Sequence, residues 1–581
     1  MVTSRFRTLS IFLALLLIAL VPSVLQSAQS EAVCGSEGVV AASHERAAAA
    51  AVEIMRQGGN AVDAAVAAAF TIGVVEPHAS GLGGGGGMVI YLGEEDRSYF
   101  INYYGSASWN VNDLGSYDRG SYRHTAKSIL VPGTVAGLTL ALERFGKLPI
   151  EKVIAPAIRC AREGFEIDET LGGLLLDSVE LLEKNSNTAE VFLGEMGFPP
   201  MTGDTLKQPE LAATLEEIAR HGRDGFYKGR VAREMVEGIS DLGGVISMDD
   251  LESYRAVLSE PLQGTYRDCE IIAANPPLSG ASVIEALNIL ENRDLKSMGH
   301  YTESAATLHF MVEAIRFTHA DRYPFVGDPE FGYVPVNGLT SKDYAQTRYH
   351  DINQFQADPP RYRDTTEGSP NLFDRKGDKD PRKKRRESKN WSDANEFGKP
   401  ADSWGEDIFD SFGSKKKPEK SKSRKEKDKN ESSRSPTASG SSITVESLVP
   451  DEASTTHLSV VDSDGNAVSL TQTLGTFFGS AQTVSGVLFN CGMSNFSRTR
   501  PVNVIEPGKR PRTSICPTIV LRAGELFLVV GTPGASRIIS TVVEMLVNLI
   551  DFDMDIAEAN NAPRFYTSKY EDYLHVEGGI P

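Results

Sequence analysis

The stretch TTHLSVVD at residues 455–462 begins the pattern that decides the fold. Its polar and apolar residues alternate, and it leads into the sequence SDGN at residues 463–466, a strong signal for a hairpin turn. A second alternating run follows over residues 467–473. We therefore predict a β-hairpin whose first strand begins at Thr455.

The length of the hairpin loop decides which side chains of the two strands face each other. A three-residue loop over residues 463–465 places Thr455 opposite Thr473. A two-residue loop over residues 464–465 places Thr456 opposite Thr473 instead. Both registers bring threonine hydroxyl groups together at the start of the first strand.

A threonine hydroxyl becomes a useful nucleophile only when a base lies beside it, and the α-amino group of the same residue can be that base. An α-amino group has a pKa of roughly 7.7–8.0, close to neutral pH. We therefore hypothesise that the chain cuts itself between Ser454 and Thr455 and that Thr455 is then the nucleophile. The alternative is a threonine-rich hairpin with a purely structural role.

The overall composition limits the classes of function. The chain has 581 residues, a formal net charge of -19 and a hydrophobic fraction of 40%, which is typical of a globular protein and argues against bulk binding of nucleic acid. Its five cysteines are widely spaced without a CxxC pair, and no nucleotide-binding P-loop is present in the sequence. We therefore expect no cofactor, no metal ion and no nucleic-acid partner.

Residues 1–30 have the layout of an export signal. Arg5 and Arg7 precede an apolar run over residues 9–21, and small polar residues follow. The apolar run is short for a membrane span, so we expect either a cleaved signal peptide or a signal anchor that attaches the protein to a membrane. The mature protein is expected to be secreted, periplasmic or on the extracellular face of a membrane.

A charged segment separates the hairpin from the preceding part of the chain. Residues 360–450 include the basic run RKKRR at residues 382–386 and are nearly free of aliphatic residues between Asp374 and Glu431. Such a segment cannot bury enough apolar surface to fold, and we predict that it is a disordered insert. Basic runs can also bind nuclear import factors or anionic surfaces, but behind an export signal a solvated loop is expected.

Two glycine-rich turns are candidates for site-forming loops. The first, residues 83–87, is expected either to pack two backbone segments closely or to line a site. The second, residues 531–537, connects a predicted strand at residues 526–530 to a predicted helix over about residues 538–549. Backbone N–H groups at such a strand-to-helix turn can bind the oxyanion of an acyl-transfer intermediate.

Over residues 36–575, apart from the insert, the sequence resembles the γ-glutamyltransferase (γ-glutamyl transpeptidase) family of N-terminal-nucleophile hydrolases. The motifs that carry this resemblance are Glu76-Pro77, residues 83–87, residues 132–137, Asp321-Arg322, and residues 327–329, 455–462, 478–480, 508–511, 531–539 and 561–564. The resemblance implies an α+β fold, a four-layer αββα sandwich. It also implies self-cleavage into a large subunit, residues 36–454, and a small subunit, residues 455–581.

The resemblance assigns roles to individual residues of the predicted chemistry. By position, Thr455 matches the nucleophile, which selects the three-residue hairpin loop, and Thr473 matches a supporting threonine that is hydrogen-bonded to it. Gly534 and Ala535 match the paired glycines of the oxyanion hole. Because the second residue here is alanine, we expect it to serve through its N–H group if its φ is negative.

The residues that would bind the substrate depart from the family pattern. Thr513 and Ser514 match a serine pair that holds the substrate carboxylate, but Tyr104 stands where the family has an arginine. The positions that bind the α-amino group in the family read Gly475, Gly492 and Asn495 here. Each lost charge-assisted contact is worth roughly 1.5–3 kcal/mol, so recognition of a γ-glutamyl zwitterion should be weakened.

Three functions follow from these observations. The first is a γ-glutamyltransferase-like enzyme that hydrolyses or transfers the acyl group of γ-glutamyl amides such as glutathione through a threonyl acyl-enzyme. The second is a related amidase or acylase whose amide or peptide substrate carries an uncharged acyl group, which the altered positions favour. The third is a family member that has lost turnover, which the retained residues Thr455, Thr473 and Gly534 argue against.

Overall fold

A computed structural model describes residues 32–111, 122–194, 197–357, 364–374, 453–567 and 573–580. The predicted export signal at residues 1–30 and most of the predicted disordered insert, from residue 375 to residue 450, lie outside these described residues. In the part of the chain that the structure describes, helices long and apolar enough to cross a membrane are absent.

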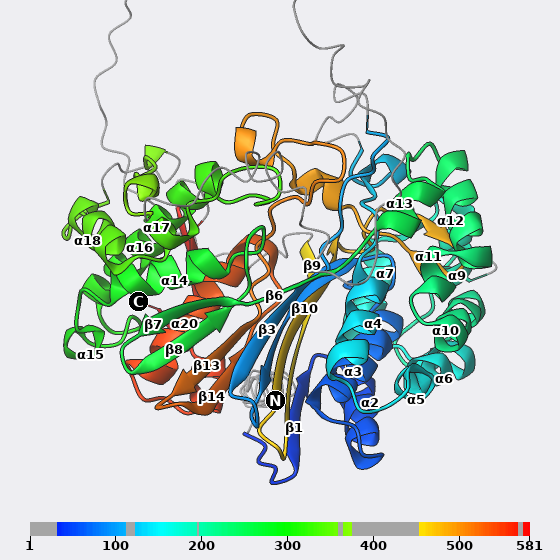
Figure 1. Cartoon of the computed structure of the whole chain (residues 1–581), viewed down its shortest axis with the longest axis horizontal. Helices are drawn as coiled ribbons and strands as arrows, with labels where there is room; N and C mark the ends of the chain where they lie inside the picture. The colour runs from blue at the N-terminus through cyan, green and yellow to red at the C-terminus, as the bar shows by residue number, and fades with distance from the viewer. Residues whose placement is uncertain are drawn as a thin grey trace, which may run out of the picture.

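The first of two large sheets is antiparallel and has six strands in the order β1-β9-β10-β2-β3-β6. The predicted hairpin forms its two inner strands β9 and β10, coloured yellow in Figure 1. The strands are β1 (Gly38–Ala42), β2 (Gly85–Leu92), β3 (Arg97–Asn102), β6 (Val257–Ser259), β9 (Ala453–Asp462) and β10 (Ala467–Thr476).

The second sheet is antiparallel and has four strands in the order β14-β13-β8-β7. These are β7 (Leu262–Tyr266), β8 (Cys269–Ala273), β13 (Thr518–Arg522) and β14 (Glu525–Val530). Polar side chains join the two sheets: Ser459 Oγ on β9 donates to the carbonyl oxygen of Val529 at 3.1 Å, and Ser469 Oγ on β10 donates to that of Val530 at 3.0 Å. The sheets therefore form the two inner layers of a sandwich.

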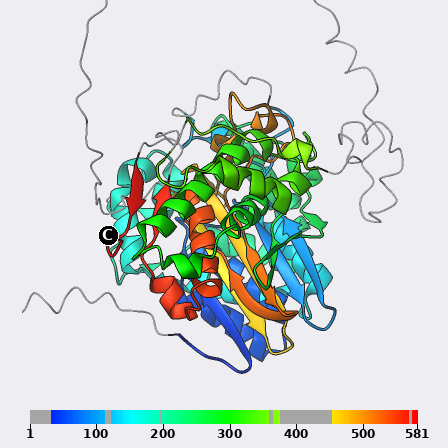
Figure 2. The same cartoon turned by 90° about the vertical axis from the view of Figure 1, so that its left-hand side faces the viewer.

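Helices cover both outer faces of the sandwich (Figures 1 and 2). On the first sheet, the cover includes α2 (Glu45–Arg56), α3 (Ala61–Val75), α4 (Thr134–Phe145), α6 (Ala155–Glu163) and α10 (Pro209–His221). On the second, it includes α14 (Gly280–Leu290), α16 (Ala305–Phe325), α18 (Lys342–Asp351) and α20 (Ile538–Ile550). Two large apolar clusters fill the layers, and the predicted αββα architecture is confirmed.

Shorter elements connect these layers. The remaining helices are α5 (Ile150–Val153), α7 (Glu169–Asp177), α8 (Val179–Leu182), α9 (Ser186–Phe192), α11 (Asp224–Tyr227), α12 (Gly229–Asp241), α13 (Met248–Ser253), α15 (Leu295–Met298), α17 (Val336–Leu339) and α21 (Ile556–Asn561). The short strands are β4 (Phe165–Glu166), β5 (Thr205–Leu206), β11 (Thr483–Val484), β12 (Val487–Leu488), β15 (Phe565–Thr567) and β16 (Leu574–Val576). Single 3₁₀ turns are η3 (Ala126–Ser128), η5 (Pro370–Leu372), η9 (Gly492–Asn495), η10 (Pro501–Asn503) and η11 (Ala535–Arg537).

The hairpin has the three-residue loop. The N–H group of Asp462 donates to the carbonyl oxygen of Asn466 at 3.0 Å, and Gly465 has a φ of +76°. Along the strands, Thr456 pairs with Gln472. The residues next to this pair, away from the turn, are Thr455 on β9 and Thr473 on β10. The register in which Thr455 faces Thr473 is therefore confirmed.

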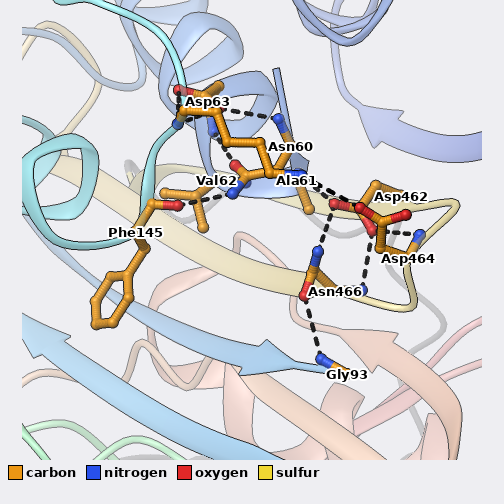
Figure 3. A network of polar contacts seen from close by, with 10 residues as sticks. Asn60, Ala61, Val62, Asp63, Gly93, Phe145, Asp462, Asp464 and Asn466 are labelled. Atoms are coloured by element: carbon orange, nitrogen blue, oxygen red, sulfur yellow. Dashed lines mark hydrogen bonds and ion pairs between the residues drawn. The ribbon is translucent and has the colours of Figure 1, made fainter. Parts of the chain in front are cut away.

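The turn end of the hairpin is tied to the first helical layer, as Figure 3 shows. The Asp462 carboxylate accepts hydrogen bonds from the backbone N–H and side-chain amide of Asn466, and also from the N–H of Ala61, the first residue of α3. Asn466 in turn accepts from the N–H of Gly93. A carboxylate is favourable at a helix N-terminus, where backbone N–H groups lack partners within the helix. This network fixes the hairpin at the end opposite to Thr455.

The glycine run at residues 83–87 allows β2 to lie very close to its neighbours. A Cβ atom on Gly84 would lie 2.6 Å from the carbonyl oxygen of Thr473, and one on Gly86 would lie 2.4 Å from that of Thr471. Both distances are too short for any side chain. The glycines therefore serve close backbone packing, the first of the two predicted alternatives, and hold the strand that carries Thr473.

Candidate active site

Thr455 lies near the start of β9, with a side chain that is 8% exposed, and its peptide bond to Ser454 is intact in this structure. Thr455 Oγ1 lies 2.5 Å from the carbonyl oxygen of Ser454 and 3.1 Å from Thr473 Oγ1. The Thr473 hydroxyl donates to the same carbonyl oxygen at 2.5 Å. Two hydroxyl groups thus surround the carbonyl that self-cleavage would attack.

The scissile residue is held from its other side as well. Ser454 Oγ donates to the carbonyl oxygen of Thr476 at 2.6 Å, and the N–H of Gly475 donates to Thr473 Oγ1 at 2.9 Å. The pairing of β9 and β10 shifts by one residue between Gln472 and Gly475, which is a β-bulge. Bulges re-aim side chains next to reactive sites, and this one directs the Thr473 hydroxyl at the carbonyl of Ser454.

The glycine-rich turn predicted as an oxyanion hole lies beside the nucleophile. Gly534 and Thr455 line the same cavity, and η11 packs against β9. Gly534 has a φ of +121° and Ala535 has a φ of +50°, so the condition under which Ala535 was expected to serve, a negative φ, is not met. A residue with a Cβ is disfavoured in this left-handed region by roughly 1–3 kcal/mol, so the turn imposes strain on Ala535.

Replacing Ala535 by glycine should relieve this strain and raise the free energy of unfolding by about 1 kcal/mol. Denaturant unfolding of the two proteins would measure the change. A matched control is Ala523→Gly, because Ala523 has a φ of +54° and lies exposed in the turn between β13 and β14, away from Thr455. We expect a similar stabilisation from the control without a change in turnover. Destabilisation by Ala535→Gly would contradict the strain at this turn.

The cavity beside Thr455 has a volume of about 480 Å³. Its walls are the turn at residues 532–534, the pair His78 and Phe477, and the hairpin of β15 and β16. The C-terminal hairpin contributes Tyr566 and His575, whose rings are stacked with centroids 5.7 Å apart. A small molecule can therefore reach the nucleophile from this side.

Several titratable groups outside the predicted set of site residues line this cavity. Glu76 accepts a hydrogen bond from Thr456 Oγ1 at 2.7 Å, and its burial raises the pKa of its carboxyl group. Burial lowers the pKa of His78 to about 4, so this imidazole is neutral at working pH. Arg537 and Arg564 are the arginines among the described lining residues. All four lie within or next to motifs that carried the family resemblance, but side-chain identity alone did not indicate that they face one cavity.

Three of the six predicted substrate-binding residues form a second, neutral cluster. Asn495 Nδ2 donates to the hydroxyl of Tyr104 at 2.7 Å, and the Thr513 side chain is also hydrogen-bonded to this hydroxyl. Tyr104 is buried, and burial raises its pKa to about 12, against the opposing effect of these two hydrogen bonds. The cluster therefore carries no charge at working pH.

The other three predicted residues lie differently. A Cβ on Gly475, which has a φ of +106°, would lie 2.8 Å from Cys491 Sγ, and one on Gly492 would lie 2.4 Å from Leu130 Cδ1, so a side chain at either position would require its neighbour to move. Ser514 contacts a different residue: its Oγ accepts a hydrogen bond from Arg322 Nη2 at 3.2 Å. In the uncleaved chain, none of the six residues is among the described lining of the cavity beside Thr455.

The chain is similar to known proteins over most of its length. The family model described as Gamma-glutamyltranspeptidase matches residues 47–382 and 408–581. The chain is 35% identical to "Glutathione hydrolase proenzyme" of Escherichia coli (strain K12), over 94% of this chain and 83% of the relative. It is 32% identical to "Acylase ACY 1 proenzyme" of Pseudomonas sp. (strain SE83), over 94% of this chain and 85% of the relative.

Solved structures share the fold. The structure of a cephalosporin acylase from Bacillus halodurans superposes with a TM-score of 0.73 at 22% identity and covers 96% of this chain and 89% of its own, which shows a common fold. The structure of gamma-glutamyltranspeptidase from Helicobacter pylori has a TM-score of 0.55 at 32% identity and covers 58% of this chain and 97% of its own.

Proposed function

This chain belongs to the gamma-glutamyltranspeptidase family of N-terminal-nucleophile hydrolases, and from that premise we propose that it cleaves itself before Thr455 and then transfers or hydrolyses the acyl group of an amide substrate. The observation that carries the proposal is the pair of hydroxyl groups, from Thr455 and Thr473, at the carbonyl of Ser454.

In the proposed self-cleavage, Thr455 Oγ1 attacks the carbonyl carbon of Ser454 while the Thr473 hydroxyl polarises the carbonyl oxygen. The C–N bond breaks, the nitrogen of Thr455 gains a proton, and an ester joins Ser454 to Thr455 Oγ1. Water then hydrolyses the ester, which leaves a carboxylate on Ser454 and a free α-amino group on Thr455. The short contacts of both hydroxyls to this carbonyl support the step.

The same hydroxyl then acts on substrates. The free α-amino group of Thr455, with a pKa of roughly 7.7–8.0, takes the proton from Oγ1 as it attacks the substrate carbonyl. The N–H group of Gly534 stabilises the oxyanion, and the amine portion leaves with a proton. Water or a second amine resolves the acyl-enzyme, which gives hydrolysis or transfer.

The two subunits are proposed to stay together after cleavage without a covalent link. Strands β9 and β10 of the small subunit lie between β1 and β2 of the large subunit in the first sheet. Strand β13 of the small subunit pairs with β8 of the large subunit in the second sheet. Separation would therefore break both sheets and expose the apolar interior between them.

We propose that the acyl group is uncharged, in contrast to the γ-glutamyl zwitterion. The supporting observation is the neutral cluster of Tyr104, Asn495 and Thr513, where the family pattern has an arginine, an aspartate and a serine. The similarity to a relative named an acylase supports the same choice. A γ-glutamyl amide is the second candidate, because Arg322 donates to Ser514, one of the pair predicted to hold a substrate carboxylate.

The self-cleaved protein should hydrolyse a neutral acyl 4-nitroanilide, such as the phenylacetyl derivative, with kcat/KM at least about 10-fold above that for γ-glutamyl-4-nitroanilide. Replacing Tyr104 by arginine should shift this ratio towards the γ-glutamyl substrate, whereas Tyr104→Phe removes only the hydroxyl group and serves as the control. Preference of the wild type for the γ-glutamyl substrate would overturn the neutral-acyl proposal and leave the second candidate.

We also propose that the enzyme acts outside the cytosol, on the basis of the export-signal layout of residues 1–30. N-terminal sequencing of the large subunit from the expressing cell would test this. A mature N-terminus near residue 30 would support export with cleavage, and an intact Met1 in a cytosolic fraction would contradict it.

A further inference from the structure

The C-terminal hairpin of β15 and β16 carries a tyrosine that contacts the predicted oxyanion turn. The Tyr566 hydroxyl donates to Ser536 Oγ at 2.7 Å. Ser536 is the central residue of η11, which begins directly after Gly534. Tyr566 and Gly534 both line the cavity beside Thr455. A side chain from an element 30 residues away in the sequence thus reaches the turn next to the nucleophile.

The backbone of this turn needs support from outside. Gly534 has a φ of +121° and Ala535 a φ of +50°, and a residue with a Cβ keeps such a conformation only where surrounding contacts hold it. Two supporting hydrogen bonds are local: the N–H of Arg537 donates to the carbonyl oxygen of Gly534 at 2.9 Å, and Ser540 Oγ donates to that of Arg537 at 2.9 Å. Among the described residues, the hydrogen bond from Tyr566 is the one that reaches the turn from an element distant in sequence.

Tyr566 is itself fixed by strand β15. Phe565 and Thr567 on either side of it are buried, and the ring of Phe565 meets that of Tyr301 edge-on, with centroids 5.5 Å apart. Since side chains alternate along a strand, Tyr566 faces the cavity instead, and its ring stacks on His575, its partner in register on β16. The tyrosine is therefore held in place by packing that does not involve the turn.

The turn presents a donor that an oxyanion can use. In the part of the chain that the structure describes, the N–H group of Gly534 has no hydrogen-bond acceptor. An N–H group stabilises a developing oxyanion well only if its direction is fixed before the reaction, because turning it during the reaction costs free energy. The direction of this N–H depends on the backbone of the turn, and the turn is tied to Tyr566 through Ser536.

We propose that Tyr566 is a positioning residue for acyl transfer: its hydroxyl holds Ser536 and thereby keeps the N–H of Gly534 directed at the oxyanion. The role is indirect, since Tyr566 acts through the turn and not on the reacting atoms. It concerns the reaction on substrates and not self-cleavage, in which the Thr473 hydroxyl is the proposed donor to the carbonyl of Ser454. This inference rests on the proposed acyl-transfer function.

Tyr566→Phe removes the hydroxyl and keeps the stacked ring, so it tests the hydrogen bond alone. For whichever acyl 4-nitroanilide the self-cleaved protein accepts, we expect kcat and kcat/KM to fall equally, by about 10-fold, as for an interaction that acts only in the transition state. Ser536→Ala should give the same loss, and the double variant should lose no more than either single variant. Ser536→Thr keeps an acceptor and should keep most of the turnover.

Self-cleavage separates this role from a purely structural one. Tyr566→Phe and Ser536→Ala should both cleave themselves at nearly the wild-type rate. Equal slowing of self-cleavage and turnover would show that the hairpin supports the whole site, and this result would overturn the inference. An unchanged kcat in Tyr566→Phe would overturn it as well.

Tyr573→Phe is the matched control for loss of a tyrosine hydroxyl from this hairpin. The Tyr573 ring lies 4.9 Å from that of His575, between centroids, and Tyr573 is outside the described lining of the cavity. We expect this variant to keep the wild-type kcat. A loss equal to that of Tyr566→Phe would show a general effect on the hairpin and would contradict a specific contact with Ser536.

Failure of the proposed function has a different signature. If the wild type hydrolyses no anilide, binding of 2-phenylethylboronic acid is measured by calorimetry. Its boron accepts a lone pair from Thr455 Oγ1, the hydroxyl proton passes to the α-amino group of Thr455, and the tetrahedral boronate places an oxygen where the oxyanion would form. Binding to Tyr566→Phe that is about 10-fold weaker than to the wild type would support the inference without any turnover. Equal binding to the two proteins, or none to the wild type, would overturn it.

Discussion

Replacing Thr455 by alanine should leave the chain as a single full-length polypeptide with no measurable amidase activity. The Thr455 hydroxyl lies 2.5 Å from the carbonyl oxygen of Ser454. Among the described hydroxyls next to this bond, only that of Thr455 belongs to the residue that gains a free α-amino group on cleavage. Loss of a nucleophile costs at least about 10³-fold in turnover. A denaturing gel of freshly purified protein, with N-terminal sequencing of any small fragment, would measure self-cleavage directly.

Two variants control for this experiment. Thr455→Ser keeps a hydroxyl at the same place and should still cleave, although the rate will differ. Thr456→Ala removes the neighbouring hydroxyl, which is hydrogen-bonded to Glu76 rather than to Ser454, and should yield a small fragment that begins at Thr455. Cleavage before residue 455 in Thr455→Ala would show that another group attacks the bond, and the assignment of the nucleophile would fall.

Replacing Thr473 by alanine should slow self-cleavage by about 10²-fold, so that uncut chain accumulates. The Thr473 hydroxyl donates to the carbonyl oxygen of Ser454 at 2.5 Å, where negative charge develops during the attack. Removing one such donor costs about 10²–10³-fold in comparable sites, because the charge then develops with fewer hydrogen bonds. A time course of cleavage after synthesis in a cell-free system would give the rate.

The same strand offers a matched control for Thr473. Thr471 lies two residues away, is also buried, and its hydroxyl is hydrogen-bonded to His457 at 2.9 Å rather than to the Ser454 carbonyl. Thr471→Ala should therefore cleave at nearly the wild-type rate, and Thr473→Ser should recover most of the lost rate. Equal slowing in Thr471→Ala and Thr473→Ala would indicate that packing of β10, and not the donated hydrogen bond, controls cleavage.

The arrangement explains why cleavage must follow folding. In the proposed self-cleavage, the carbonyl of Ser454 is activated by the Thr473 hydroxyl on β10, and the Ser454 side chain is hydrogen-bonded to Thr476. Both contacts exist only after β9 and β10 have paired. Both strands are inner strands of a sheet whose other members come from the large subunit. The uncut chain therefore builds the site, and the cut only releases the α-amino group of Thr455 within it.

Local chemistry predicted the central feature of the fold well. The turn residues SDGN and the alternation on both sides of them predicted the hairpin. The structure has the three-residue loop, with Gly465 at a positive φ. Register in a hairpin depends on the loop length, and the turn residues left two loop lengths open. The resemblance to the family selected the register in which Thr455 faces Thr473. The strand-to-helix turn after β14 was likewise predicted from its glycines.

Other parts of the site could not be obtained from local pattern. The sequence left the φ of Ala535 open, and the turn holds it at +50°, because the path from β14 into α20 sets the backbone there and not the preference of alanine. The close approach of β2 to β10 decided between two roles for the glycine run. Each outcome depends on neighbours that are distant in the sequence.

The sequence by itself determined the hairpin, its register, the order of motifs that identifies the family, and therefore the position of Thr455. These properties depend on residues that are close together along the chain or on motifs that can be recognised individually. Only the tertiary structure decided that Tyr104, Asn495 and Thr513 form one neutral cluster and that Arg537 faces the cavity beside Thr455. The direction and burial of side chains arise from packing between the layers. The pKa values of the groups in a site, and the hydrogen-bond donors that face it, follow from that packing.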